Sequence, residues 1–449
     1  MPAVLDLKPE EIDTKEKRGK YTVCVVGCEE TGVFYAAGFA EAGFNVICTD
    51  VDQTMVKSLS KGKIVFSNRE LEAKWKRFLR RGLLDVTSEL EKAVSQSDIV
   101  VMTLTTKIDG KKQPDYSEVE NACKQVGKAL SRGVLFVYGG IAGLGFTEGV
   151  VKETLENTSG FKSGEDFGLV YCPFQFFGGQ SLTSVLGQEL KVAGFDGKSS
   201  DAAVNVLGVV AGEPVNQVSD VKTLEAAMLF DIAKRDTSLA LANELAVFCE
   251  NASIDYFETL KLLGGDGKSF SPAVEAEVGS NEACLLLESA ENLNAKLRLP
   301  VLARKINEDI VRHAINLTKD ALRSCGKTLR RARVAVFGTA KTKAATVVFV
   351  KMLERRGAKV SLYDPLRPKN DFSDVARVLK RTMKETVEGA DCIVMLTEQD
   401  QFKRLNLKRL IAVMKKPAAL VDLTGMFEPE KVERKGFTYR GLGRGVGKK

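Results

Sequence analysis

A strand, a glycine-bounded turn, a helix and a second strand follow one another between residues 21 and 50, and this order constrains the fold more than any other feature. YTVCVVG is a short apolar run that ends at Gly27. TGVFYAAGFAEAG carries small and apolar residues at helical spacing and is stopped by Gly43. NVICTD then predicts a second strand that ends at Asp50. This order is typical of parallel strands joined by helices.

Later apolar runs extend the pattern. Segments that begin at Ser97, Gly133 and Phe167 predict three further strands, with helical segments between them. Strands that are apolar along their whole length indicate a parallel sheet covered on both faces. At Arg333 the order restarts, and RVAVFG, AKVSLYDP, DCIVMLT and AALVDLTG predict the strands of a second sheet. The chain therefore contains two α/β lobes.

The region between the two lobes reads as helical. Residues 221–252 predict one long helix without Pro or Gly, and a second helical stretch runs from about Glu282 to Ser324, interrupted near Pro300. Long helices between two α/β units often form a dimer interface, so we expect a homodimer. We predict an α/β fold with two Rossmann-like parallel-sheet lobes that flank this central long-helix region. The expected divisions are a polar leader (1–20), an N-terminal Rossmann-like domain (21–215), a central helical dimerisation domain (216–325) and a C-terminal Rossmann-like domain (326–449).

Composition limits the kinds of active site that the chain can form and indicates the cellular compartment of the protein. The single histidine, His313, argues against a His-rich metal site and a Ser-His-Asp triad, so we expect no metal. The nine cysteines form no C-x-x-C pair and read as reduced thiols of a cytoplasmic protein. The first twenty residues are polar and fit a loose leader rather than an export signal. No apolar run approaches about 18 residues, so we expect no membrane helix.

Charge is distributed unevenly along the chain. From Gly326 to Lys449 there are 29 Lys and Arg against 13 Asp and Glu, whereas the whole chain has a net charge of +7. Such a basic segment can attract phosphates, nucleic acid or an acidic partner surface. The alternative is a solvated basic face with no ligand.

The first turn carries most of a dinucleotide-binding pattern. It reads Gly27-Cys28-Glu29-Glu30-Thr31-Gly32, with Asp50 closing the next strand. In such turns the first glycine permits the tight turn, the third permits close helix packing, and the acid accepts the ribose hydroxyls. The second glycine, which lets the backbone approach the pyrophosphate, is replaced by Glu29. Either Glu29 repels and obstructs the pyrophosphate, or it turns outward from a wider loop.

Several later segments are weak signals singly but specific in their order. They are DVDQ (50–53), DGKKQPDYSEVENA (109–122), ANELAVFCE (242–250), VSLYDP (360–365), ADCIVMLTEQDQF (390–402) and GFTYRGLGRG (436–445). With the glycine turn, they resemble the UDP-glucose/GDP-mannose dehydrogenase family, the NAD-dependent nucleotide-sugar 6-dehydrogenases. The resemblance extends from Tyr21 to Gly445.

The resemblance implies a cofactor, a substrate and a set of site residues. Family members use NAD to oxidise a primary alcohol of a UDP- or GDP-sugar twice, to the uronate, and a Cys captures the aldehyde while a Lys and an Asn stabilise the oxyanion. The resemblance also makes the C-terminal lobe the nucleotide-sugar-binding domain. The positions carried over are Cys284 and Glu288 as catalytic residues, Gly27, Gly32, Asp50, Thr106 and Thr147 for the cofactor, and Arg444 for the substrate.

The chain departs from the family at several catalytic positions. Counted back from the Asn-Glu pair of the long helix, the positions of the catalytic Lys and Asn hold Met228 and Ile232. The strand-end segment that supplies the catalytic Glu holds Gly178 instead. Cys284 is followed by three leucines, an apolar setting that disfavours a thiolate, so packing is its alternative role.

Three hypotheses follow from these residues. The first is a divergent NAD-dependent nucleotide-sugar dehydrogenase. The second is a catalytically inactive family member that serves as a nucleotide-binding, regulatory or scaffold subunit. The third is a protein that binds phosphates or nucleic acid through its basic C-terminal lobe.

Overall fold

The computed structural model describes residues 4–64, 66, 68–109, 111–174, 182–263, 270–274, 282–339, 343–365 and 375–445. The chain divides into two compact units. The N-terminal unit comprises Met1–Asp231 and Cys284–Leu293, and the C-terminal unit comprises Ile232–Ala283 and Asn294–Lys449. Helix α10 (Val221–Ala252) runs from one unit into the other. The expected three-domain division stays a prediction.

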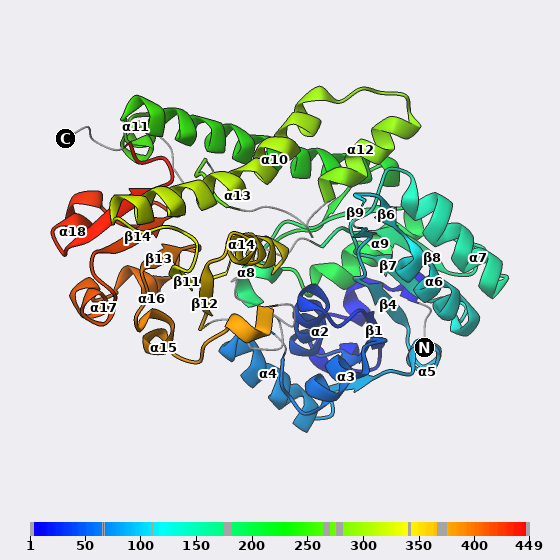
Figure 1. Ribbon diagram of the computed structural model, residues 1–449. Helices are drawn as coiled ribbons and strands as arrows, with labels where there is room; N and C mark the ends of the chain where they lie inside the picture. The colour runs from blue at the N-terminus through cyan, green and yellow to red at the C-terminus, as the bar shows by residue number, and fades with distance from the viewer. Residues whose placement is uncertain are drawn as a thin grey trace. The chain divides into compact units, whose positions relative to one another are not determined.

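The N-terminal unit is built on a mainly parallel sheet (Figure 1). Within its described residues, eight strands lie in the order β10-β9-β8-β7-β4-β1-β2-β3, and only the β8–β9 pair is antiparallel. All five strands expected in this lobe are present. The strands are β1 (Thr22–Val26), β2 (Asn45–Thr49), β3 (Leu84–Thr87), β4 (Ile99–Met102), β7 (Leu135–Tyr138), β8 (Gly168–Tyr171), β9 (Lys191–Gly194) and β10 (Asn216–Gln217), with β5 (Lys107–Ile108) and β6 (Pro114–Asp115) in a separate hairpin.

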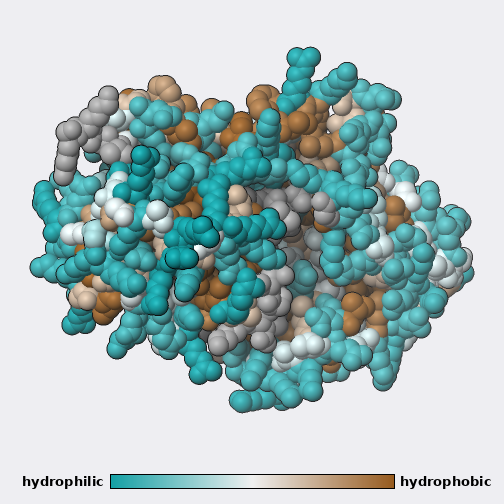
Figure 2. Space-filling model, in the orientation of Figure 1, coloured by the Kyte–Doolittle hydropathy of each residue, from teal (hydrophilic) through white to brown (hydrophobic). Residues whose placement is uncertain are grey.

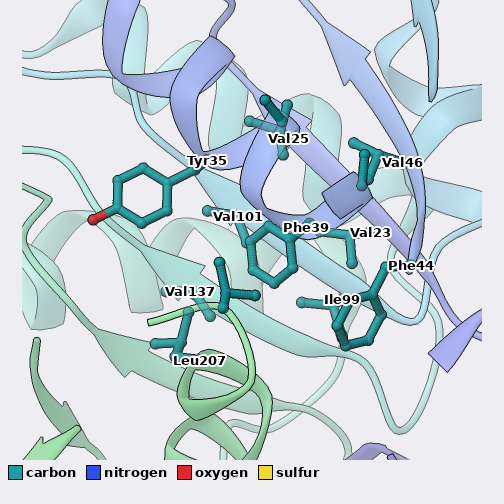
Figure 3. Close-up of a cluster of buried hydrophobic side chains, with 14 of the residues drawn as sticks. Val23, Val25, Tyr35, Phe39, Phe44, Val46, Ile99, Val101, Val137 and Leu207 are labelled. Atoms are coloured by element: carbon teal, nitrogen blue, oxygen red, sulfur yellow. The ribbon is translucent and has the colours of Figure 1, made fainter. Parts of the chain in front are cut away.

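Alternate side chains of the strands enter two apolar clusters, one on each face of this sheet. Val23 and Val25 of β1 belong to one cluster, in which the Phe39 and Phe44 rings meet edge to face 5.6 Å apart (Figure 3). Cys24 belongs to the other cluster. The fully buried, parallel sheet expected from the sequence is confirmed. The helices of this unit are α2 (Glu30–Ala42), α3 (Gln53–Ser60), α4 (Arg69–Arg80), α5 (Leu90–Ser95), α6 (Ser117–Ala129), the π-helical turn η3 (Thr147–Lys152), α7 (Glu153–Ser159), α8 (Leu182–Leu186), α9 (Gly197–Gly208) and α12 (Glu282–Asn292).

The expected loose leader is wrong, because residues 4–20 pack against the N-terminal unit. They form the 3₁₀ turns η1 (Val4–Asp6) and η2 (Pro9–Glu11) and the short helix α1 (Lys15–Arg18). Val4, Leu7 and Ile12 are buried in the cluster that also contains the apolar faces of α2 and α9. Asn205 Nδ2 donates to the Leu7 carbonyl at 3.0 Å. The burial of these three side chains was not predicted, because most residues of the leader are polar.

The C-terminal unit repeats the same architecture on a smaller scale. Among its described residues, five parallel strands lie in the order β12-β11-β13-β14-β15. Four of them match the strands expected after Arg333. The fifth, β15, lies at the edge of the sheet, and its buried and half-buried residues alternate. The strands are β11 (Arg333–Phe337), β12 (Lys359–Tyr363), β13 (Cys392–Met395), β14 (Ala418–Asp422) and β15 (Phe437–Gly441). The helices of this unit are α11 (Tyr256–Leu263), α13 (Arg298–Ser324), α14 (Lys343–Arg355), α15 (Met383–Val387), α16 (Asp400–Lys403), α17 (Leu407–Val413) and α18 (Pro429–Glu433).

The central helices agree with the expected pattern. The helix expected over 221–252 is α10, and the long stretch after it is interrupted between α12 and α13, just before Pro300. Pro300 lies in the first turn of α13, where its missing N–H leaves no helical hydrogen bond unmade. None of the described helices is both long and apolar enough to cross a membrane.

Candidate functional site

The turn between β1 and α2 is shaped by two glycines. Gly27 has a φ of 97°, in the region that favours glycine, and a Cβ there would lie 2.9 Å from Leu104 Cδ2. Gly32 lies in the first turn of α2, and a Cβ there would lie 1.8 Å from the Gly27 carbonyl oxygen. Neither position accepts a side chain. Both glycines therefore bring α2 close to the end of β1, as the sequence pattern predicts.

Asp50 lies directly after β2 and faces this turn. Its Oδ2 accepts a hydrogen bond from the Cys28 N–H at 2.7 Å, and its Oδ1 accepts one from the Asp52 N–H at 2.9 Å. A carboxylate oxygen has two lone pairs, so each retains capacity for a further donor. The carboxylate can therefore hold the turn and accept ribose hydroxyls at the same time.

A cavity of about 290 Å³ opens beside Asp50, at the carboxyl ends of β1, β2 and β4. This is the end of a parallel sheet at which nucleotides bind. Apolar side chains line much of it, together with a few groups that can form hydrogen bonds. The lining residues are Val26, Gly27, Thr49, Asp50, Val51, Leu90, Leu104, Glu118, Asn121, Ala122 and Gln125.

Glu29 is the N-cap residue of α2, and its side chain makes no capping hydrogen bond. The residue is exposed, whereas the neighbouring Cys28 is buried. Of the two alternatives for this position, an outward side chain agrees with that exposure. The charge of the Glu29 carboxylate also helps to raise the pKa of Lys107.

Thr106 and Thr147, the other two residues assigned to the cofactor, are both buried. The Thr147 N–H and hydroxyl both donate to Glu225 Oε1, at 2.8 and 2.6 Å, and the Gly145 N–H donates to Glu225 Oε2 at 2.6 Å. Burial of Glu225 raises the pKa of its carboxyl group above the ordinary value. Thr147 is thus held by a carboxylate of α10, while the Thr106 hydroxyl lies near that of Tyr138.

Cys284 and Glu288, the residues assigned to catalysis, both lie on α12. Cys284 is 6% exposed. The Glu288 carboxylate accepts a hydrogen bond from the Tyr116 hydroxyl, and burial, followed by this bond, raises the pKa of Tyr116. Ser289 Oγ accepts the Leu144 N–H at 3.0 Å. These contacts attach α12 to the N-terminal unit.

The positions that carry the catalytic Lys and Asn in the resembled family are buried. Met228 is 4% exposed and Ile232 is 7% exposed, four residues apart on α10. Neither side chain can donate a hydrogen bond. Gly178, which stands at the position of the catalytic Glu, lies outside the described residues.

Arg444, assigned to the substrate, is held by contacts within the C-terminal unit. Its guanidinium pairs with Asp255, donates to the Gly425 carbonyl at 3.0 Å and lies 4.5 Å above the centre of the Phe257 ring. Together these contacts tie the end of the chain to α11 and to the loop after β14.

Two functional candidates were missed by the sequence pattern. Lys107, the first residue of β5, forms an ion pair with the cavity residue Glu118. Glu225 binds the turn before η3, as described above. The sequence offers a signal only for Lys107, a basic residue directly after Thr106. No group of residues suited to a metal ion occurs in the described part of the chain.

Two sequence models of one family match the chain. The NAD binding domain of the UDP-glucose/GDP-mannose dehydrogenase family matches residues 21–207, and the UDP binding domain of the same family matches residues 339–429. The chain belongs to this family. The resemblance inferred from the ordered segments is therefore confirmed, and the protein is a member of a family of NAD-binding oxidoreductases.

Curated relatives and solved structures of the family match nearly the whole chain. UDP-N-acetyl-D-mannosamine dehydrogenase of Pyrococcus horikoshii is 26% identical over 94% of this chain and 99% of its own, and UDP-glucose 6-dehydrogenase of Rhizobium meliloti is 24% identical over the same shares. The solved structure of the Pyrococcus enzyme has a TM-score of 0.82 at 24% identity, covering 94% of this chain and 99% of that one. That of the NDP-N-acetyl-D-galactosaminuronic acid dehydrogenase of Methanosarcina mazei has a TM-score of 0.73 at 25% identity, covering 98% of each.

The family's NAD binding domain contains the glycine turn, Asp50 and the cavity. The residues present fit the adenosine half of NAD, because an apolar slot accepts a base and the Asp50 oxygens accept ribose hydroxyls. At the pyrophosphate position the chain departs from the family, since Glu29 adds a charge and a side chain where the family has glycine.

Proposed function

We propose that this protein binds NAD through its N-terminal unit but does not carry out the four-electron oxidation of a nucleotide sugar. It acts as a non-catalytic, nucleotide-binding member of its family. The observation that carries the proposal is the burial of two apolar side chains, Met228 and Ile232, where the family has its oxyanion-stabilising Lys and Asn.

The absence of the hydrogen-bond donors at these two positions is the main argument against the oxidation. A thiohemiacetal oxyanion needs hydrogen-bond donors aimed at it, and removal of one such donor typically lowers the rate by about 10²–10³. Met228 and Ile232 supply none. Cys284 is nearly inaccessible and is followed by Leu285 and Leu286, both buried, which disfavours the thiolate that the reaction needs.

The cofactor site retains what binding requires. Bound NAD supplies a hydride acceptor to the active members of the family. In this chain Asp50 orients the adenosine ribose, the cavity takes the adenine ring, and Gly27 and Gly32 keep the turn close to β2. Because the family's UDP binding domain spans 339–429, we infer that a UDP-sugar is the second ligand.

The helices of the C-terminal unit expose apolar side chains that suit a homodimer. Leu241, Leu245 and Phe248 lie on one face of α10 at helical spacing, and Phe248 is 62% exposed. Leu299 and Leu302, at the start of α13, are also exposed. Figure 2 shows apolar side chains along the upper edge of the view, over α11 and the start of α13. Several large apolar side chains exposed on these helices suit an interface, so we infer a dimer through them.

Two measurements test the cofactor and the chemistry separately. Calorimetry with NAD is expected to show micromolar binding. Incubation with NAD and a panel of UDP- and GDP-sugars is expected to give no NADH, with the Pyrococcus enzyme as the positive control. NADH production that disappears in a Cys284→Ser variant would contradict the proposal and make the protein a dehydrogenase.

The dimer has its own test. Light scattering of the purified protein is expected to give twice the chain mass, and Phe248→Glu is expected to give a folded monomer. The exposed Glu244→Gln change on the same helix serves as the control. A wild-type monomer would remove the dimer from the proposal.

A further inference from the structure

Four carboxylates lie around the turn and cavity of the N-terminal unit. Glu29 and Glu30 stand at the start of α2, Asp50 follows β2, and Glu118 comes from α6. Asp50 and Glu118 both line the cavity. The pyrophosphate of a dinucleotide is an anion, and like charges close together disfavour binding. Binding of a pyrophosphate at this turn therefore requires a positively charged group, and the residues of the turn itself include none.

Lys107 places a positively charged side chain beside one of these carboxylates. Its ammonium group pairs with the Glu118 carboxylate. The hydrogen bond to Glu118 raises the pKa of Lys107 most, and the charges of Glu29 and Asp50 raise it further. The ammonium group thus pairs with a carboxylate of α6 that lines the cavity, and it also interacts electrostatically with Glu29 and Asp50.

We propose that Lys107 binds the pyrophosphate of NAD and offsets the charge of Glu29. The inference rests on the proposed NAD binding and deepens it by naming a residue that determines affinity for the phosphates. Glu29 departs from the family pattern, since it replaces the second glycine of the turn, and Lys107 directly follows Thr106, a position assigned to the cofactor.

The side chain of Lys107 suits this role. It is 62% exposed, and its long flexible stem lets the ammonium leave Glu118 for a ligand at the mouth of the cavity. A glycine at position 29 lets the backbone approach the pyrophosphate closely, and this chain lacks that glycine. An ammonium group that reaches over from β5 supplies the lost attraction without any movement of the turn.

Calorimetry with three ligands tests the assignment. NAD and ADP carry a pyrophosphate, whereas adenosine does not. Lys107→Gln is expected to weaken binding of NAD and ADP about tenfold and to leave adenosine binding within about twofold. The matched control is Lys124→Gln, which removes the same charge from α6, where Lys124 pairs with Glu120. The control is expected to change none of the three affinities. Equal weakening of all three ligands by Lys107→Gln, or no weakening of NAD, would overturn the assignment.

The charge relation between the two residues has a separate test. Glu29→Gln alone is expected to tighten NAD binding, and the double variant with Lys107→Gln is expected to return close to the wild-type affinity. If the wild type binds NAD and Glu29→Gln does not tighten that binding, the inference fails while the proposed NAD binding stands. If none of these proteins binds NAD, ADP or adenosine, the proposed function itself fails.

Discussion

The two units contain the same strand–turn–helix–strand geometry, yet their acids have different surroundings. Gly27 and Gly338 both have positive φ, and the N–H of each donates to the carbonyl of the last residue of the next strand at 2.9 Å. In the N-terminal unit, Asp50 is bound by backbone N–H groups beside a cavity. In the C-terminal unit, Asp364 is buried and accepts from side chains, the Thr339 hydroxyl at 2.6 Å and the Gln399 amide at 3.2 Å.

This comparison shows that the strand order places an acidic residue after the second strand of each unit. Whether that residue can bind a ligand depends on the groups that surround it. Backbone donors occupy fixed directions and leave lone pairs of Asp50 toward the cavity. Side-chain donors reach Asp364 from the turn and from the loop after β13, and each of its two carboxylate oxygens accepts one of them. The same arrangement of strands therefore gives one acid placed for a ligand and one acid used for packing.

The largest expected effect comes from the glycine of the N-terminal turn. Gly32→Ala places a Cβ against the Gly27 carbonyl and is expected to lower the free energy of unfolding by at least about 3 kcal/mol. Gly338→Ala, at the position in the C-terminal unit that corresponds to Gly27, places a Cβ 2.9 Å from a side-chain carbon and is expected to cost less, about 1–2 kcal/mol. Chemical denaturation measures both. A Gly32→Ala protein as stable as the wild type would contradict the close packing of α2.

The next effect separates the two acids. Asp50→Asn is expected to weaken NAD binding about 10- to 100-fold, because ribose hydroxyls donate to a charged group. Asp364→Asn is expected to leave NAD binding unchanged and to lower stability by about 1–2 kcal/mol, because Thr339 loses a charged acceptor. Calorimetry and denaturation of both variants provide the measurements. Equal loss of NAD affinity in the two variants would break the comparison.

The smallest effect concerns the pH dependence of Glu225. Because burial raises its pKa in the folded protein, its contribution to stability is full below the ordinary Glu pKa and is lost as the pH rises through the raised value. Wild-type stability relative to Glu225→Gln is therefore expected to fall as the pH rises above the ordinary Glu pKa. Urea unfolding at several pH values measures this difference. The control is Glu148→Gln, which changes an exposed glutamate of η3, next to Thr147. No such fall in stability is expected for this variant.

The sequence predicts the architecture because its signals are local. Apolar runs mark the strands of both units, and the spacing of Gly27, Gly32 and Asp50 identifies the turn and its acid. The contacts that modify the site are not local. Thr147 meets Glu225 from 78 positions away, and Tyr116 meets Glu288 from 172 positions away. No periodicity connects such pairs, so they became visible only once the strands and helices were assembled.

Charge pairing at the turn illustrates the same point. Glu29 is conspicuous in the sequence because it replaces a glycine in a known pattern. Lys107 lies near it in space only because β5 follows β4, the neighbour of β1 in the sheet. A substitution that looks damaging in one segment can therefore be compensated from another segment that carries no motif.

The packing of the β1–α2 turn also bears on how such motifs persist in evolution. Gly32 is required by the Gly27 carbonyl, and Asp50 holds the Cys28 N–H, whether or not a nucleotide is bound. Selection for folding alone would retain these three residues in a lineage that had abandoned the cofactor. Retention of Gly27 and Gly32 therefore reports on folding, and it is not by itself a sign that a lineage still uses the nucleotide.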